Sequence, residues 1–145
     1  MTSYTNEIPD DPGRRGAVAV VMRDGRMLVI RRSCHVVAPL TYCFPGGGIE
    51  GDESEEEALI REFREEIGVT VRPLRRIWQC VTAWKVELAW WLGDLPDDAT
   101  PVPDSSEVES VHWFTPREMA ELPDLLESNR EFLELVLRGE IRLEK

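Results

Sequence analysis

Residues 44–69 read FPGGGIEGDESEEEALIREFREEIGV, which joins a run of glycines to a dense run of acids. Within this stretch Leu59, Phe63 and Ile67 recur at four-residue spacing, so a helix would carry them on one core-facing stripe. Gly68 follows the stripe, and glycine is the residue that most readily ends a helix in the left-handed conformation. The stretch therefore predicts an amphipathic helix of roughly four turns.

The start of this helix is predicted at Asp52. Its carboxylate can cap the first turn while Glu55 returns the contact, which makes a capping box in acidic form. Before the helix stand Pro45 and three glycines, 46–48. Such a run is typical of a tight turn, but it also lets backbone amides and carbonyls approach a ligand closely.

A second face of the predicted helix is acidic. Glu62, Glu65 and Glu66 stand at positions i, i+3 and i+4, so at about 100° per residue they lie together. Arg61 and Arg64 are expected to point away from the centre of this face. Carboxylates so placed repel one another by roughly 0.2–0.5 kcal/mol per pair, which a hard cation such as Mg²⁺ relieves. A solvated face is the alternative; the preceding glycines favour a phosphate-and-metal site.

The charge of the chain is concentrated in the same segment. The formal net charge is −11, and between Glu50 and Glu66 there are nine acids and two arginines, a balance of −7. An acid excess repels a phosphate backbone, so nucleic acid is disfavoured as a partner. No apolar run approaches the roughly 18 residues that cross a bilayer, and the first 15 residues lack an apolar signal core. Both features predict a cytoplasmic protein that does not bind membranes.

The rest of the chain alternates between strand and helix signals. Asp24 and Gly25 form a two-residue hairpin signal between apolar runs at 17–22 and 27–30. Further strands are predicted at 42–44, at 69–92 (two or three strands) and at 108–114, with a loop at 93–106. Capping boxes at Thr115–Glu118 and Ser128–Glu131 start two more helices, the last of which ends before Gly139.

This order of elements predicts an α/β fold with a mixed β-sheet between helical layers. Residues 1–13 are expected to form a flexible tail and residues 14–145 a single domain, since 145 residues suit one compact core. Cys34, Cys43 and Cys80 are odd in number and have no metal-binding spacing, which indicates reduced thiols.

The acidic segment resembles the Nudix box. That pattern is Gly, five residues, Glu, seven residues, Arg-Glu, an aliphatic residue, any residue, Glu-Glu, any residue, Gly and an aliphatic residue. Gly47, Glu53 and the run from 61 to 69 supply every fixed residue at the right distance, and Phe63 replaces an aliphatic one. The resemblance covers roughly residues 15–122 and implies a Nudix-type α/β/α sandwich.

The resemblance also implies roles for individual residues. Glu62, Glu65 and Glu66 would bind Mg²⁺ or alternatively Mn²⁺, with the Gly46 carbonyl as a further ligand. Glu53 falls about 180° from Glu62 on a straight helix, so a supporting role is expected, in which it pairs with Arg61 and fixes the box together with Gly68. The resemblance implies three catalytic acids, Glu62, Glu66 and Glu107. Glu62 is the first choice as general base. Glu107 is the second choice, with an ordinary loop acid as the alternative.

Substrate contacts implied by the resemblance lie outside the helix. Arg31 or Arg32 would reach a substrate phosphate, with surface placement as the alternative. Tyr42 is expected to pack in the core, with base stacking as the alternative, and Gly47 would contact the substrate. Trp90 and Trp91 must point to opposite faces of a sheet.

The reaction implied by the resemblance is metal-dependent hydrolysis of a diphosphate linkage. The substrate would be a small nucleoside diphosphate derivative, such as an NTP or dNTP, a nucleotide sugar or a dinucleoside polyphosphate. Alternatives are an RNA 5′-end pyrophosphohydrolase and a non-catalytic nucleotide-sensing module, although such modules typically lose box glutamates that this chain keeps. Isomerisation of an allylic diphosphate would need further metal-binding residues that the sequence does not display. A homodimer is left open.

Overall fold

The computed structural model describes residues 14–145, so the predicted tail at residues 1–13 lies outside the described residues. Within the described part, no helix has the length and apolar character that a membrane span requires. The elements are, in chain order, β1 (Arg15–Arg23), β2 (Arg26–Arg32), β3 (Tyr42–Cys43), β4 (Gly46–Gly48), α2 (Glu55–Ile67), β5 (Arg72–Val81), β6 (Glu87–Asp94), β7 (Val108–Phe114), α3 (Pro116–Ala120) and α4 (Glu127–Leu137).

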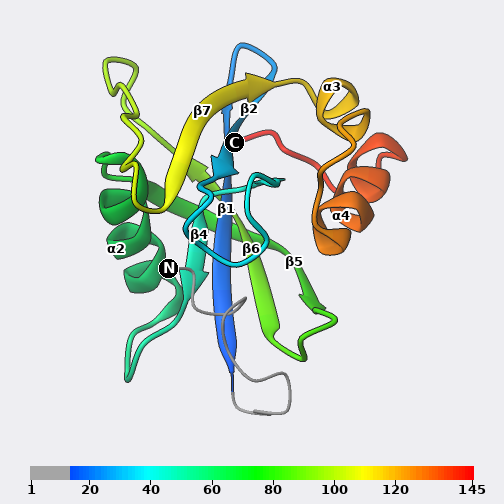
Figure 1. The fold of residues 1–145 in the computed structure, drawn as a ribbon. Helices are drawn as coiled ribbons and strands as arrows, with labels where there is room; N and C mark the ends of the chain where they lie inside the picture. Colours follow the sequence, from blue (N-terminus) through cyan, green and yellow to red (C-terminus); the bar gives the residue numbers. More distant parts are fainter. Residues whose placement is uncertain (1–13) are drawn as a thin grey trace.

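Seven strands form one mixed sheet, as predicted (Figure 1). The main path runs β3-β2-β1-β6-β5, while β4 pairs with β1 and β7 pairs with β2. The β1–β6 pairing is parallel and the other strand pairings are antiparallel. The register of β1 with β2 covers Met22–Met27 and Arg23–Arg26, next to the hairpin turn. The two strands diverge beyond the turn, which gives β4-β1-β6-β5 on one side and β3-β2-β7 on the other.

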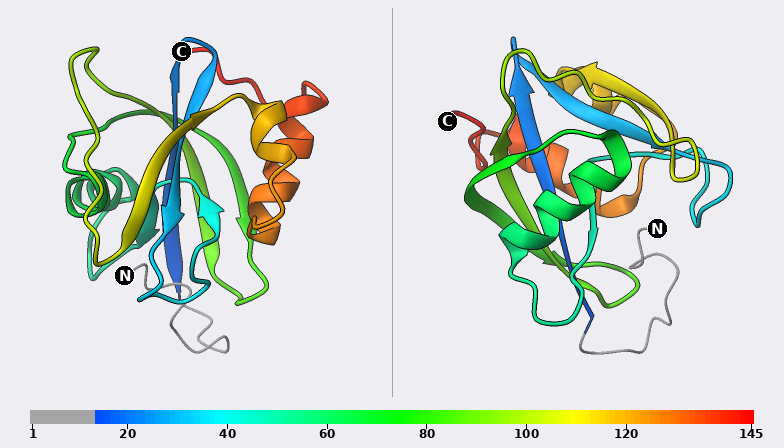
Figure 2. Two further views of the ribbon diagram at one scale, coloured as in Figure 1. Left: turned by 45° about the horizontal axis from the view of Figure 1, so that its top comes forward. Right: turned by 90° about the vertical axis from the view of Figure 1, so that its left-hand side faces the viewer.

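Helices cover both faces of this sheet, which makes an α/β/α sandwich (Figures 1 and 2). Helix α2 lies on one face, where the predicted stripe of Leu59, Phe63 and Ile67 is fully buried in one core cluster. Helices α3 and α4 lie on the opposite face. Trp90 belongs to the cluster under α4 and Trp91 packs against the cluster under α2, which confirms that the two rings lie on opposite sides of β6.

The glycine run, which is typical of a tight turn, forms the short strand β4 instead. Strand β4 pairs antiparallel with β1, so that Gly46 stands opposite Val18. Gly46 has a φ of 146°, and a Cβ there would lie 2.2 Å from the carbonyl oxygen of Ala17. The strand therefore needs glycine, because β1 runs too close for a side chain.

The start of α2 lies two residues after its predicted position. Ser54 is the N-cap: its hydroxyl accepts the amide of Glu57, and the Glu57 carboxylate accepts the amide of Ser54. The box predicted at Asp52 and Glu55 is wrong, because the chain still turns at Gly51, which has a φ of 53°. The predicted end is confirmed: Gly68 is left-handed and its amide donates to the Arg64 carbonyl.

Other local signals have mixed outcomes. Asp24 and Gly25 both have positive φ, and Thr115 starts α3 with its capping box, as predicted. The box predicted at Ser128 is wrong: α4 is capped by Leu126, which makes no side-chain cap and packs against the core instead. Residues 69–92 contain β5 and most of β6, joined by a turn at 82–86.

Replacing Phe132 tests the core under α4. The ring is fully buried, stacks on Trp90 with centroids 4.5 Å apart and meets Phe44 edge-on at 5.4 Å. Phe132→Ala should lower the free energy of unfolding by about 3–5 kcal/mol, measured in urea. Leu137→Ala, on the same helix but 46% exposed, is the control and should cost much less. Equal losses in the two variants would contradict this packing.

Candidate metal and catalytic site

Three carboxylates from two parts of the chain meet beside β4. Glu62 and Glu66 come from α2, and Glu107 immediately precedes β7. One carboxylate oxygen from each lies within 4.8 Å of the others. Glu62 is 4% exposed and Glu66 only 2%, so this is a buried acidic cluster rather than a solvated helix face. Its members differ from the predicted triplet, because Glu107 takes the place of Glu65.

The glycines of β4 let the helix acids come this close. A Cβ on Gly47 would lie 2.6 Å from the carboxylate of Glu62, so only glycine leaves room for that side chain. The amide of Gly46 donates to Oε1 of Glu66 over 3.1 Å. Strand β4 therefore leaves room for the Glu62 carboxylate and donates a backbone hydrogen bond to that of Glu66.

The acidic loop before β7 brings Glu107 to the same place. The amides of Val102 and Asp104 donate to the carbonyls of Ile67 and Glu66, each over 2.9 Å, and so satisfy groups at the end of α2. The amide of Glu107 in turn donates to the carbonyl of Asp104 over 3.0 Å. The loop is thereby attached to the helix that carries the other two acids.

Burial and mutual repulsion raise the pKa values of the two helix acids. Burial is the largest cause of the rise in the pKa of Glu62 to about 7; Arg61 opposes the rise, and the charges of Glu65 and Glu107 add to it. Burial, followed by the charge of Glu62, holds the pKa of Glu66 well above its ordinary value. A cation held among these oxygens would favour the ionised forms.

Arg61 organises the exposed side of the cluster, contrary to the expectation that it points away. Its guanidinium makes a forked pair with Glu53, at 2.7 and 2.9 Å, which is the predicted contact. Its Nη1 also donates to Glu62 over 3.1 Å and to Glu65 over 3.2 Å. The carbonyl of Gly48 accepts a further bond over 2.9 Å. The helical angle places the Cβ atom, but this long side chain reaches around the helix.

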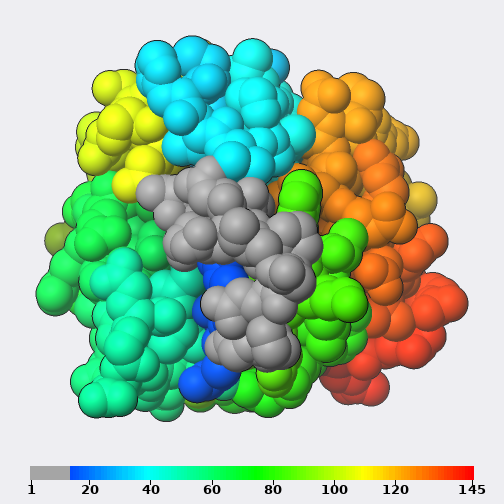
Figure 3. Space-filling model, turned by 60° about the horizontal axis from the view of Figure 1, so that its bottom comes forward, coloured from blue at the N-terminus to red at the C-terminus, as the bar shows by residue number. Residues whose placement is uncertain are grey.

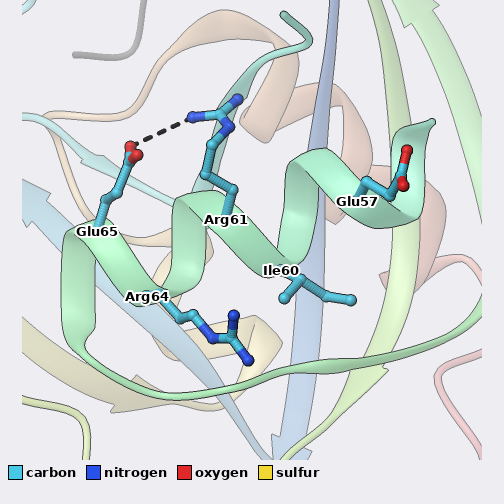
Figure 4. Close-up of a pocket in the computed structure, with 5 residues that line it drawn as sticks. All are labelled: Glu57, Ile60, Arg61, Arg64 and Glu65. Carbon is cyan, nitrogen blue, oxygen red and sulfur yellow. Dashed lines mark hydrogen bonds and ion pairs between the residues drawn. The ribbon is translucent and has the colours of Figure 1, made fainter. Parts of the chain in front are cut away.

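Glu65 lies at the rim of the site. Its side chain is half exposed, and Figure 4 shows it pointing toward Arg61 from the next turn of α2, while Arg64 points elsewhere. The shallow pocket in that view is on the outer face of the helix and is lined by Glu57, Ile60, Arg61, Arg64 and Glu65. It does not include the buried acids, so the candidate site is defined by the carboxylates.

Arg32 and Arg31 point to opposite faces of β2. Arg32 is 2% exposed, which rules out surface placement for it; its Nε donates to the carbonyl of Val37 over 2.8 Å. Its positive charge acts to lower the pKa values of Glu66 and Cys43. Burial has the larger effect on Cys43 and raises its pKa to about 11. Arg31 is half-buried and lies over the ring of Tyr42, 5.6 Å from the centroid.

Tyr42 packs against other aromatic rings, in keeping with its expected core role. It meets His112 and Phe114 edge-on, with centroids 5.4 and 5.9 Å apart. Burial, with the charge of Arg31, lowers the pKa of His112. The Tyr42 residue as a whole is half-buried.

The acidic cluster fits a hard divalent cation. Its donors are carboxylate oxygens, which such ions prefer, and they converge within 4.8 Å from two chain segments. Gly47 leaves the space that the Glu62 carboxylate occupies in this cluster. The cluster is therefore compatible with a divalent metal ion.

Comparison with known proteins gives the family. A model described as the NUDIX domain matches residues 13–136. The chain belongs to the Nudix family. A CTP pyrophosphohydrolase of Escherichia coli (strain K12) is 30% identical over 111 residues, which are 72% of this chain and 78% of that protein. An NAD-capped RNA hydrolase, NudC, of Chromobacterium violaceum is 34% identical over 68% of this chain but only 37% of its own length.

Solved structures of this Nudix protein's relatives share the fold. The MutT protein from Methanosarcina mazei Go1 has a TM-score of 0.74 and 23% identity, covering 87% of this chain and 94% of that one. The E. coli ORF135 protein has a TM-score of 0.69 and 23% identity, covering 86% and 89%. The family and the matched relatives together indicate a hydrolase that acts on pyrophosphate bonds.

Gly47→Ala tests the close approach of β4 and α2. The added methyl group would collide with the Glu62 carboxylate at 2.6 Å, so the variant should lose about 1–3 kcal/mol of stability in urea unfolding. In the background of Glu62→Ala the same change should cost clearly less, because the colliding group is gone. An equal cost in both backgrounds would show that Gly47 is required for another reason.

The raised pKa of Glu62 predicts how stability depends on pH without metal. The folded protein binds this proton up to about pH 7, whereas the unfolded chain releases it near 4.5. Stability should therefore fall as pH rises from about 4.5 to about 7, by at most about 1.4 kcal/mol per unit for one group, and the contribution of this group should level off above that. Melting temperatures in EDTA measure the slope, and Glu62→Gln should reduce it. A wild-type slope equal to that of the variant would contradict the assigned pKa.

Proposed function

We propose that this Nudix protein hydrolyses the diphosphate linkage of a small nucleoside diphosphate derivative with Mg²⁺, or alternatively Mn²⁺, as cofactor. The observation that carries the proposal is the convergence of Glu62, Glu66 and Glu107 within 4.8 Å beside a glycine strand. A buried cluster of like charges is costly unless a cation balances it. Glu65 at the rim and the carbonyl of Gly46 are further candidate ligands.

Within this proposal the carboxylates hold the ion and one of them takes the proton of water. When bound, a divalent ion neutralises charge on diphosphate oxygens and acidifies water. Glu62 is the first candidate for the base, and we assign the proton to Oε1 because Oε2 already accepts a bond from Arg61. Glu107 is the second candidate. Glu53 and Arg61 keep Glu62 in place through their forked pair.

Substrate groups beyond the diphosphate would meet the residues around β2 and β3. Tyr42, which is half-buried, is proposed to stack on a base, and Arg31, beside it, to contact a phosphate. Arg32 is proposed to act from within the protein, on the charge of Glu66, because its side chain is buried. The match to the CTP pyrophosphohydrolase supports a free nucleotide as substrate.

RNA is the second candidate substrate. An RNA pyrophosphohydrolase of Marinomonas sp. is 40% identical over 62 residues, 41% of this chain, and NudC proteins also match. The net charge of −11 weighs against it, because a highly acidic chain repels a phosphate backbone. We therefore rank the small nucleotide first.

A substrate panel tests the proposal. Nucleoside triphosphates, nucleotide sugars, dinucleoside polyphosphates, NAD-capped RNA and 5′-triphosphorylated RNA would each be incubated with Mg²⁺ or Mn²⁺, and the products separated by chromatography. Cleavage at a diphosphate of a free nucleotide is the expected result, and it should stop in EDTA. Cleavage of RNA alone would favour the second candidate, and no cleavage of any compound would contradict a catalytic role.

Neutral replacements of the acids test the site itself. Glu66→Gln and Glu107→Gln should each lower kcat roughly 100-fold or more with the best substrate, because each removes a charged oxygen ligand. Glu56→Gln is the matched control on the same helix: Glu56 is exposed and lies outside the acidic cluster, so kcat should stay near wild type. Full activity in Glu66→Gln would contradict the proposed metal site.

A further inference from the structure

Ser33 is a buried polar residue directly after β2, with an exposed fraction of 1%. Its amide donates to the carbonyl of Glu107 over 2.9 Å, and its hydroxyl donates to the carbonyl of Ser106 over 3.0 Å. The same hydroxyl oxygen accepts the amide of His35 over 3.1 Å. One small side chain thus joins the segment that carries Glu107 to the loop at 33–41.

The segment at 104–107 is held from two sides. On one side the amide of Asp104 is bonded to α2 through the carbonyl of Glu66. On the other side, Ser33 donates hydrogen bonds to two consecutive carbonyls, those of Ser106 and Glu107. Viewed from the end where β1 begins, the 33–41 loop (cyan) lies beside the segment before β7 (yellow) (Figure 3). The position of Glu107 relative to the helix acids depends on both attachments.

We infer that Ser33 is a positioning residue for Glu107, an inference that rests on the proposed metal-dependent hydrolysis. Glu62 and Glu66 share one helix and keep their spacing through its backbone. Glu107 comes from the segment before β7, so its carboxylate oxygen stays close to those of Glu62 and Glu66 only while this segment keeps its position. Losing the hydroxyl leaves the carbonyl of Ser106 without its donor in a part-buried place and frees the segment to shift. A displacement near 1 Å is enough to weaken a metal or catalytic contact strongly.

Ser33→Ala tests this role through metal binding as well as through activity. Titration calorimetry with Mn²⁺, on protein without substrate, should show an affinity about 10-fold weaker than wild type. In assays, the metal concentration for half-maximal rate should rise by a similar factor, while KM for substrate at saturating metal stays within about twofold. Ser33→Cys is the closest replacement that still carries a donor, although it is slightly larger and a weaker donor, and its Mn²⁺ affinity should lie between those of wild type and Ser33→Ala. Circular dichroism checks that each variant is folded.

Ser110→Ala is the matched control. It removes the same group from β7, the strand that follows Glu107, but its hydroxyl contacts His112 rather than the 104–107 segment. Its Mn²⁺ affinity should equal that of wild type. A loss as large as that of Ser33→Ala would mean that any lost hydroxyl near β7 has this effect, and would overturn the inference.

Glu107→Gln separates the failure of this inference from that of the proposed function. If Glu107→Gln weakens Mn²⁺ binding while folded Ser33→Ala and Ser33→Cys leave it within about twofold of wild type, the metal site stands and the positioning role is wrong. If Glu107→Gln leaves Mn²⁺ binding unchanged, Glu107 is no ligand and this inference is wrong; the proposed metal site is contradicted as well only if Glu66→Gln keeps full activity. Weakening in Glu107→Gln and Ser33→Ala, but not in Ser110→Ala, is the expected result.

Discussion

The unfavourable burial of neighbouring carboxylates is the constraint around which this molecule is built. Glu62 and Glu66 are almost completely removed from water, and Glu107 faces them within 4.8 Å. Burial and repulsion both disfavour their charged forms, as the raised pKa values of Glu62 and Glu66 show. Two guanidinium groups offset part of this cost: Arg61 bonds Glu62, and the charge of Arg32 acts on Glu66. A divalent cation supplies the remaining compensation in the proposed mechanism.

The fold brings these acids together from elements that are separate in sequence. Helix α2 carries two of them on the face next to its apolar stripe. Strand β4 consists of glycines, whose lack of side chains lets the helix approach closely. The loop before β7 carries Glu107 and is hydrogen-bonded to the last turn of α2. The large aromatic core on the far side of the sheet, around Trp90 and Phe132, fixes the strands on which all this depends. Both faces of the sheet thus carry a hydrophobic core, and the acidic cluster lies on the face that α2 covers.

Much of the fold could be predicted from the sequence where local chemistry decides the structure. Gly68 ends its helix because glycine tolerates the left-handed conformation, and Asp24 with Gly25 forms the expected hairpin turn for the same reason. The apolar stripe through Phe63 fixed the face that α2 buries. Capping signals were less decisive: several Ser, Asp and Glu residues precede α2, and the length of the turn at Gly51 selects Ser54 among them.

Features that depend on tertiary contacts could not be predicted in this way. The helical spacing groups Glu65 with the other acids, but its side chain stays at the rim beside Arg61. Glu107 joins the cluster through a loop whose path no periodicity describes; only the family resemblance pointed to it. Neither the burial of Arg32 nor the bonds of Ser33 has a signal in the sequence, because both follow from how loop 33–41 meets the segment before β7.

Anomalous diffraction from crystals soaked in Mn²⁺ would show whether the three carboxylates hold a metal ion. We expect a Mn²⁺ peak within bonding distance of carboxylate oxygens from Glu62, Glu66 and Glu107. A structure in which these three acids stay together with no ion among them, at a Mn²⁺ concentration that supports turnover, would contradict the proposed metal site. A Mn²⁺ peak at another place, with the three carboxylates separated from one another and from the ion, would also contradict it.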